Sequence, residues 1–149
     1  MKFCVKIWQV FLLMLLILTP AASAQVKKDV KAKAETVYLY GIGMNFADST
    51  IYFSAVQSLD NVAIDRAQGY LLNRYAYSEQ LNQYLYTQFG KKHETCSVFF
   101  ASTRAKAEKK CQRIRRRIAK KYGQHNIVEL PADAFRFETV PFVERTSQN

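Results

Sequence analysis

"TCSVFFASTRAKAEKKCQRIRRRIAKKYGQHNIVEL", residues 95–130, carries the strand–helix–strand pattern that decides the fold. Its opening residues are apolar on both alternating sets, which is typical of a central strand covered on both faces. Ser102 or Thr103 then caps a helix that Gly123 ends. The apolar side chains of this helix form one narrow stripe: Ala107, Cys111, Ile114, Ile118 and Tyr122. Residues 127–130 make a second, short strand.

Two alternating apolar segments upstream of this unit predict a β-hairpin, with strands at residues 36–46 and 51–59. A helix is predicted from Ser78 to about Phe89, because its apolar residues recur at helical spacing on one face. Residues 60–76 are interpreted as an ordered connection between the hairpin and this helix.

The resulting element order is β-β-α-β-α-β, which predicts an α+β fold. Two strand–helix–strand steps in one sheet imply right-handed crossovers. With similar handedness we expect both helices on one face, so the fold is a two-layer sandwich with a mixed sheet of about four strands. The other face of the sheet would then hold tyrosines such as Tyr38, Tyr40 and Tyr52.

The first 24 residues have the three parts of a secretory signal peptide. Lys2 and Lys6 supply the charged part, the apolar run extends from Ile7 to Leu18, and small residues end at Ala24. The alternative to a cleaved signal peptide is an uncleaved membrane anchor. A bilayer span needs about 20 apolar residues, so this run is short for an anchor. We therefore expect cleavage near Ala24 and an exported protein, periplasmic or secreted, with no transmembrane segment after cleavage.

The composition after the signal peptide predicts one domain with short flanking segments. Residues 25–35 are polar and rich in lysine and alanine, so we expect a flexible leader. Residues 36–143 form the single α+β domain, and the polar residues 144–149 form a loose tail.

The positive charge of the chain is concentrated in the helix that follows Thr103. The formal net charge is +10, and residues 104–121 contain ten basic residues and a single acid, Glu108. The rest of the chain after the signal peptide is close to neutral. A surface helix usually gains from i,i+4 pairs of opposite charge, whereas repulsion in this helix is mostly uncompensated.

We interpret this helix as an electrostatic platform for an anionic envelope polymer, peptidoglycan or lipopolysaccharide, or for an acidic protein. Nucleic acid would suit the charge equally well, but the export signal argues against it. The alternative is a solvated helix face that keeps the domain soluble. The predicted contact set is basic throughout: Arg104, Lys109, Arg113, Arg116, Arg117 and Lys120.

Two other function classes stay open. The first is a structural or accessory protein that docks on another envelope protein through its sheet face, with Tyr38, Tyr40 and Tyr52 in contact. The second is a small hydrolase with acids from the connection, such as Asp60 and Asp65.

The residues that usually carry chemistry are sparse. His93 and His125 each stand alone in loop-like stretches, without the ligand spacing of a metal site. The chain also has neither a phosphate-binding loop nor a G-x-S-x-G motif. We therefore predict a protein that is not an enzyme, with no cofactor and no metal.

Cys96 and Cys111 are the cysteines that survive cleavage, and export permits a disulfide. The helix doubles back over the preceding strand, so both residues lie at similar heights. A helix packs about 10 Å from a sheet, whereas a disulfide needs Cα atoms within about 7 Å. A Cys96–Cys111 disulfide is therefore one prediction, and two small buried thiols are the other.

The segment "VFFASTRAKAEKKCQRIRRRIAKKYGQHNIVEL", residues 98–130, resembles the second half of a SPOR-type repeat. In that family a strand leads through a Ser/Thr cap and an Ala-rich helix into a further strand. The resemblance implies a peptidoglycan ligand, although SPOR domains run β-α-β-β-α-β and this chain starts with a hairpin. The whole chain also resembles small exported proteins of unknown function from Bacteroidetes-type bacteria, which implies no activity and no site residues.

Overall fold

The computed structural model describes residues 31–45, 49–92 and 94–142, so the predicted signal peptide and tail lie outside the described residues. The elements follow in chain order: β1 (Ala32–Met44), β2 (Ile51–Ser54), β3 (Gln57–Asp65), α2 (Arg74–Phe89), β4 (Thr95–Ala101), α3 (Arg104–Tyr122), the short 3-10 helix η1 (Gln124–Asn126) and β5 (Ile127–Leu130). The predicted α+β class is confirmed. The second strand of the hairpin is divided into β2 and β3, which gives a sheet of five strands.

The long strand β1 organises the mixed sheet. Tyr38 and Leu39 pair with both β3 and β4, so these two strands lie on opposite edges of β1, each antiparallel to it. β2 pairs with the far end of β1 on the same edge as β3, and β5 adds to β2 in parallel. The sheet therefore runs from β4 through β1 and the divided strand to β5.

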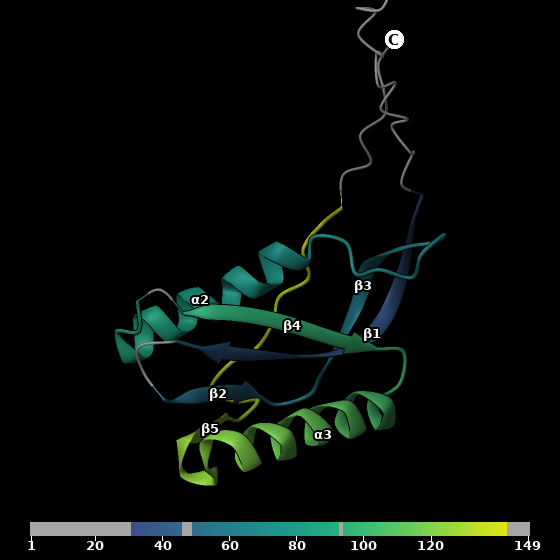
Figure 1. Ribbon diagram of the computed structural model, residues 1–149. Coiled ribbons are helices and arrows are strands. Elements are labelled where there is room, and N and C mark those ends of the chain that lie inside the picture. Colours follow the sequence, from purple (N-terminus) through teal and green to yellow (C-terminus); the bar gives the residue numbers. More distant parts are fainter. Residues whose placement is uncertain (1–30, 46–48, 93, 143–149) are drawn as a thin grey trace, which may run out of the picture.

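The two helices lie on opposite faces of the sheet, as Figure 1 shows with α2 above the strands and α3 below them. Side chains of α2 belong to the core cluster that contains Leu39 and Val98, whereas α3 packs on a second cluster around Tyr40 and Phe53. The prediction that both helices cover one face of a two-layer sandwich is therefore wrong.

The chain path explains why. Helix α2 carries the chain from β3 across β1 to β4, and α3 carries it back to β5. Right-handed crossovers that run in opposite directions across one sheet place their helices on opposite faces. Equal handedness therefore separates the helices instead of bringing them together.

The face under α2 holds most of the core. Tyr77, Leu81 and Leu85 are fully buried against the sheet. Gly41 makes this close approach possible, because a Cβ there would lie 2.6 Å from Leu81 Cδ2 and 3.1 Å from Phe137 Cζ. Gly41 therefore sets how closely α2 packs at Leu81.

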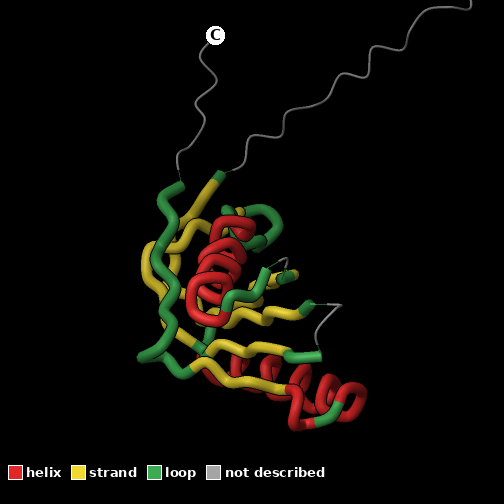
Figure 2. Tube along the Cα trace, turned by 90° about the vertical axis from the view of Figure 1, so that its left-hand side faces the viewer, coloured by secondary structure: helices red, strands yellow, loops and turns green. Residues whose placement is uncertain are grey.

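The segment after β5 crosses this same face and seals it. Phe135 and Phe137 are buried beside α2, and Figure 2 shows the segment as a long green loop that runs past that helix. The buried amide of Gln57 fixes it, because Nε2 donates to Phe135 O at 2.8 Å and Oε1 accepts from Phe137 N at 3.0 Å. Gln80 makes the same pair of bonds to the backbone of Glu138.

Three predicted boundaries differ from the structure. β3 continues to Asp65, so residues 60–65 of the predicted connection belong to a strand. β1 begins at Ala32, so the prediction of a flexible leader through residue 35 is wrong for its last four residues, which pair with β3. Helix α2 begins at Arg74, not Ser78, after Asn73 in a left-handed conformation (φ 54°). The part of the leader before Lys31 lies outside the described residues.

Candidate anion-binding helix

Helix α3 is held to the sheet by a narrow contact. Thr103 caps it, with its hydroxyl oxygen accepting from Lys106 N at 3.3 Å, and Gly123 follows its last turn. Ala107 is its one fully buried residue, and the half-buried side chains that complete the stripe are Cys111, Ile114 and Ile118. The predicted stripe is therefore confirmed for these four residues, whereas Tyr122 is exposed.

Five of the six predicted contact residues lie together on the exposed surface of α3, outside the apolar stripe that packs on the sheet. Lys109, Arg113, Arg116 and Lys120 follow one another at spacings of 4, 3 and 4, and Arg117 lies one turn beyond Arg113. All five are exposed, and none forms an ion pair within the described part of the chain. These five residues are called the outer face below.

Arg104, the sixth predicted residue, points elsewhere. Its guanidinium lies 5.5 Å from the centre of the Tyr38 ring, and its Nη1 donates to Val56 O at 3.4 Å. It also forms an i,i+4 ion pair with Glu108 at 3.5 Å. Arg104 therefore fastens the first turn of α3 to the hairpin and does not belong to the outer face.

A hollow continues the outer face toward β5. It has a volume of about 400 Å³, and its walls include Gln112, Arg115, Arg116 and Gln124. Arg115 pairs with Glu129 of β5, whereas Arg116 is unpaired among the described residues. Two amides and a free guanidinium can hydrogen-bond carboxylate or phosphate oxygens at this place.

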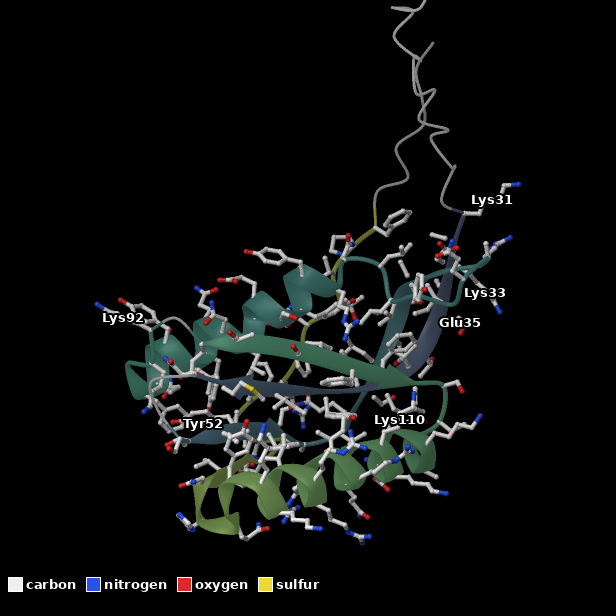
Figure 3. All side chains as sticks on the ribbon, in the orientation of Figure 1. Lys31, Lys33, Glu35, Tyr52, Lys92 and Lys110 are labelled. Carbon is white, nitrogen blue, oxygen red and sulfur yellow. The ribbon has the colours of Figure 1, made fainter. Side chains whose placement is uncertain are left out.

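The sequence did not single out the basic residues on the flank of α3 that lies beside β4. Lys106 and Lys110 line an open hollow of about 710 Å³ together with Lys33 of β1 and Arg66 after β3. Figure 3 shows Lys33, Glu35 and Lys110 around the end of β4. The i,i+4 spacing of the two lysines was visible in the sequence, but their meeting with β1 and β3 depends on the topology.

The two cysteines are free and lie on opposite faces of the sheet. The prediction of a disulfide is wrong because α3 does not cover the face from which Cys96 projects. Burial raises the pKa of the Cys96 thiol to about 12, with Glu94 and Glu79 contributing, and burial also raises the pKa of Cys111. Both thiols are therefore protonated, weak nucleophiles near neutral pH.

The predicted tyrosine face is not available for docking. Tyr40 lies under α3, stacked on Phe99 at a centroid distance of 5.4 Å, and Tyr52 is buried on the other side of the sheet. Burial raises the pKa of Tyr40 to about 12, with Cys111 adding to the rise and Arg113 opposing it. The prediction of an exposed sheet face with these tyrosines is therefore wrong, because each face of the sheet is covered by a helix.

The two acids of the predicted connection, Asp60 and Asp65, lie in β3 and serve local structure. Asp60 accepts from the Thr36 hydroxyl at 2.7 Å, and Asp65 accepts from the backbone N–H of Ala67 at 2.8 Å. Within residues 31–45, 49–92 and 94–142, no three His, Cys, Asp or Glu residues gather as a metal site would require. Nor is any helix in these ranges long and apolar enough to cross a membrane.

Comparisons with known proteins give no match to a family model, to a curated protein or to a solved structure. The likeness of residues 98–130 to a SPOR-type repeat stays a prediction. The argument for function accordingly starts from the charge and geometry of α3.

Proposed function

We propose that this protein is an exported, non-enzymatic envelope module that binds an anionic polymer or surface through the outer face of α3. The observation that carries the proposal is the set of five exposed, unpaired basic side chains on one side of a helix that the sheet holds by a narrow stripe. Solubility alone would be served by mixed charges, which also relieve repulsion along a helix.

The dimensions of the outer face indicate the kind of ligand. Lys109 and Lys120 are eleven residues apart, which is about 16 Å at the helical rise. A single small anion would contact only one or two of these side chains. A ligand with negative charges repeated over that length would contact all five.

The chemistry of the side chains favours oxyanions. Three of the five are arginines, whose planar guanidinium groups bind carboxylates and phosphates through two hydrogen bonds at once. Peptidoglycan offers carboxylates and lipopolysaccharide offers phosphates, so both fit this chemistry in the exported location that the signal sequence predicts.

The first test is co-sedimentation of the mature protein with cell-wall sacculi and, separately, with outer-membrane vesicles, over a salt series. A multivalent electrostatic contact should weaken more than about tenfold between about 50 and 200 mM salt. The variant Arg113→Glu, Arg116→Glu and Arg117→Glu should lose binding at all salt concentrations.

A matched control separates a local site from net charge. Lys31, Lys92 and Arg136 are exposed and lie away from α3, so replacing these three by Glu makes the same change in net charge. The control variant should keep most of the binding at physiological salt. Equal losses in the two variants, or no loss in either, would refute the outer face as the site.

A further inference from the structure

The hollow of about 710 Å³ lies beside an unpaired edge of β1, whose residues Lys33 and Glu35 line it. Strand β4 pairs with β1 only from Tyr38 onward, because the chain leaves the sheet after Ala101 and turns into α3. In the first part of β1, Ala32–Thr36, the residues up to Glu35 pair with β3 on one edge, and the other edge pairs with no described strand.

The hydrogen-bond pattern identifies which backbone groups face that open edge. Arg66 N donates to Lys31 O at 3.0 Å across the end of the β1–β3 ladder. Since donors and acceptors alternate along an antiparallel strand, the odd-numbered residues of this part of β1 face β3. The N–H and C=O groups of Ala32, Ala34 and Thr36 therefore point away from β3, toward the open edge.

The two sides of this edge differ in chemistry. Phe100 is half-buried at the hollow, and its partner in the ladder, Leu39, faces α2. On the side of α3 lie Lys106 and Lys110, which are exposed and have no acidic partner in the described part of the chain. Arg66, from the turn after β3, adds a third cation that forms no ion pair among the described residues. Asp65 also lines the hollow, and its carboxylate accepts from the backbone N–H of Ala67.

An extended chain placed along this edge would continue the line of β4. Its side chains would alternate between the two sides of the sheet. One set would meet Phe100 together with Lys33 and Glu35, which neutralise each other as an ion pair. The other set would meet Lys106 and Lys110. Apolar residues suit the first environment and carboxylates suit the second.

We propose that the hollow is a docking site for an extended peptide of alternating apolar and acidic residues, which adds a strand to the open edge of β1 at Ala32–Thr36. Strand addition gives affinity through the main chain, and the alternating side chains give specificity. The site uses Arg66, Lys106 and Lys110, none of which belongs to the outer face, so it does not depend on the proposed polymer-binding function.

The probe is a fluorescent peptide of about eight residues with a repeated Val-Glu sequence, measured by polarisation at physiological salt. A Val-Lys peptide reverses its charge, and a Gly-Glu peptide keeps its carboxylates but has a low tendency to form strands. We expect the Val-Glu peptide to bind at least about tenfold more tightly than either.

Ala34→Pro is the decisive variant. Because the N–H of Ala34 faces the open edge, proline removes a docking donor and leaves the β1–β3 ladder intact. Peptide binding should weaken at least about tenfold, with little change in the unfolding temperature. Undiminished binding to a folded Ala34→Pro protein would overturn the strand-addition geometry.

A charge exchange tests the other half of the site without any backbone change. Lys106→Glu with Lys110→Glu should abolish binding of the Val-Glu peptide and improve binding of the Val-Lys peptide. Arg113→Gln, Arg116→Gln and Arg117→Gln should change the affinity for the Val-Glu peptide less than about threefold. If these outer-face changes weaken peptide binding as strongly as the hollow changes do, the peptide follows general charge and the inference fails.

A second copy of the chain is the competing occupant of an open strand edge. Sedimentation velocity of the wild-type protein distinguishes the two. A dimer that Ala34→Pro converts to monomer would show that the edge pairs with itself, and it would overturn the proposal of an acidic peptide.

Discussion

Helices α2 and α3 cover the two faces of one sheet in contrasting ways. α2 buries Tyr77, Leu81 and Leu85 completely and is locked further by the segment that carries Phe135 and Phe137. α3 is longer, yet Ala107 is its one fully buried residue. α2 therefore stabilises the fold through packing, whereas most of the surface of α3 is directed to solvent.

The contrast extends to charge. Arg74 and Glu79 are the charged residues of α2, whereas α3 has ten basic residues and Glu108. Mutual repulsion of this kind lowers the stability of a helix, and the narrow apolar stripe offers little to offset it. Charge kept at a cost to stability points to a use for that charge.

The largest expected effect comes from a substitution that removes part of the packing between α2 and the sheet. Leu81→Ala removes a fully buried side chain at the centre of its face and should lower the free energy of unfolding by about 3 kcal/mol. The matched change on the other face, Ile114→Ala, should lower it by about 1 kcal/mol, because Ile114 is half-buried. Urea unfolding followed by circular dichroism measures both, and equal losses would contradict the contrast.

Gly41→Ala tests how closely α2 must approach. The new Cβ would lie 2.6 Å from Leu81 Cδ2, so the helix or its side chains must shift. We expect a loss of about 1–2 kcal/mol in the free energy of unfolding, although alanine is usually less destabilising than glycine within a strand. The double variant Gly41→Ala with Leu81→Ala is the control, since it relieves the clash: its loss should fall clearly below the sum of the single losses.

A smaller and opposite effect is expected from α3. Arg113→Gln, Arg116→Gln and Arg117→Gln relieve repulsion, so the free energy of unfolding should stay the same or rise by up to about 0.5 kcal/mol. Binding to sacculi or vesicles should nevertheless be lost. A stability loss of several kcal/mol would show instead that the arginines hold α3 in place.

Local patterns predicted the elements well, and chain topology limited the rest. Thr103 and Gly123 mark the ends of α3 as expected, and five of the six residues predicted to contact a ligand lie together on this helix. The position of Arg104 depends on Tyr38 and Val56, which lie far away in the sequence and meet it only in the folded chain.

Which face of the sheet each helix covers depends on the direction in which the chain crosses the sheet, not on the pattern of apolar residues. The sequence of neither helix indicates in which direction the chain crosses the sheet. The observed directions place Cys96 and Cys111 on opposite faces. The start of β1 was missed because its residues Ala32 to Glu35 extend past β4 and lack the apolar alternation of a covered strand. The hollow lies where β1 extends past β4, so it was missed for the same reason.

The two cysteines allow the smallest of the expected differences between the two faces of the sheet to be measured. Burial raises the pKa of Cys96 to about 12 and also raises that of Cys111, whereas a free thiol ionises near about 8.5. The unfolded chain therefore releases these protons first, so the free energy of unfolding should fall as the pH rises above about 9.

Alkylation by iodoacetamide reads out the same shifts site by site. In the folded protein both thiols should react more slowly than free cysteine at about pH 8, and the rates should keep rising above about pH 9 instead of levelling off. Cys96→Ser and Cys111→Ser isolate each site. Cys111 should be the faster of the two, because its own helix, α3, packs on the sheet with one fully buried residue, whereas Cys96 lies under the well-packed α2. A faster Cys96 would mean that α2, not α3, opens more readily, which would reverse the contrast between the two faces.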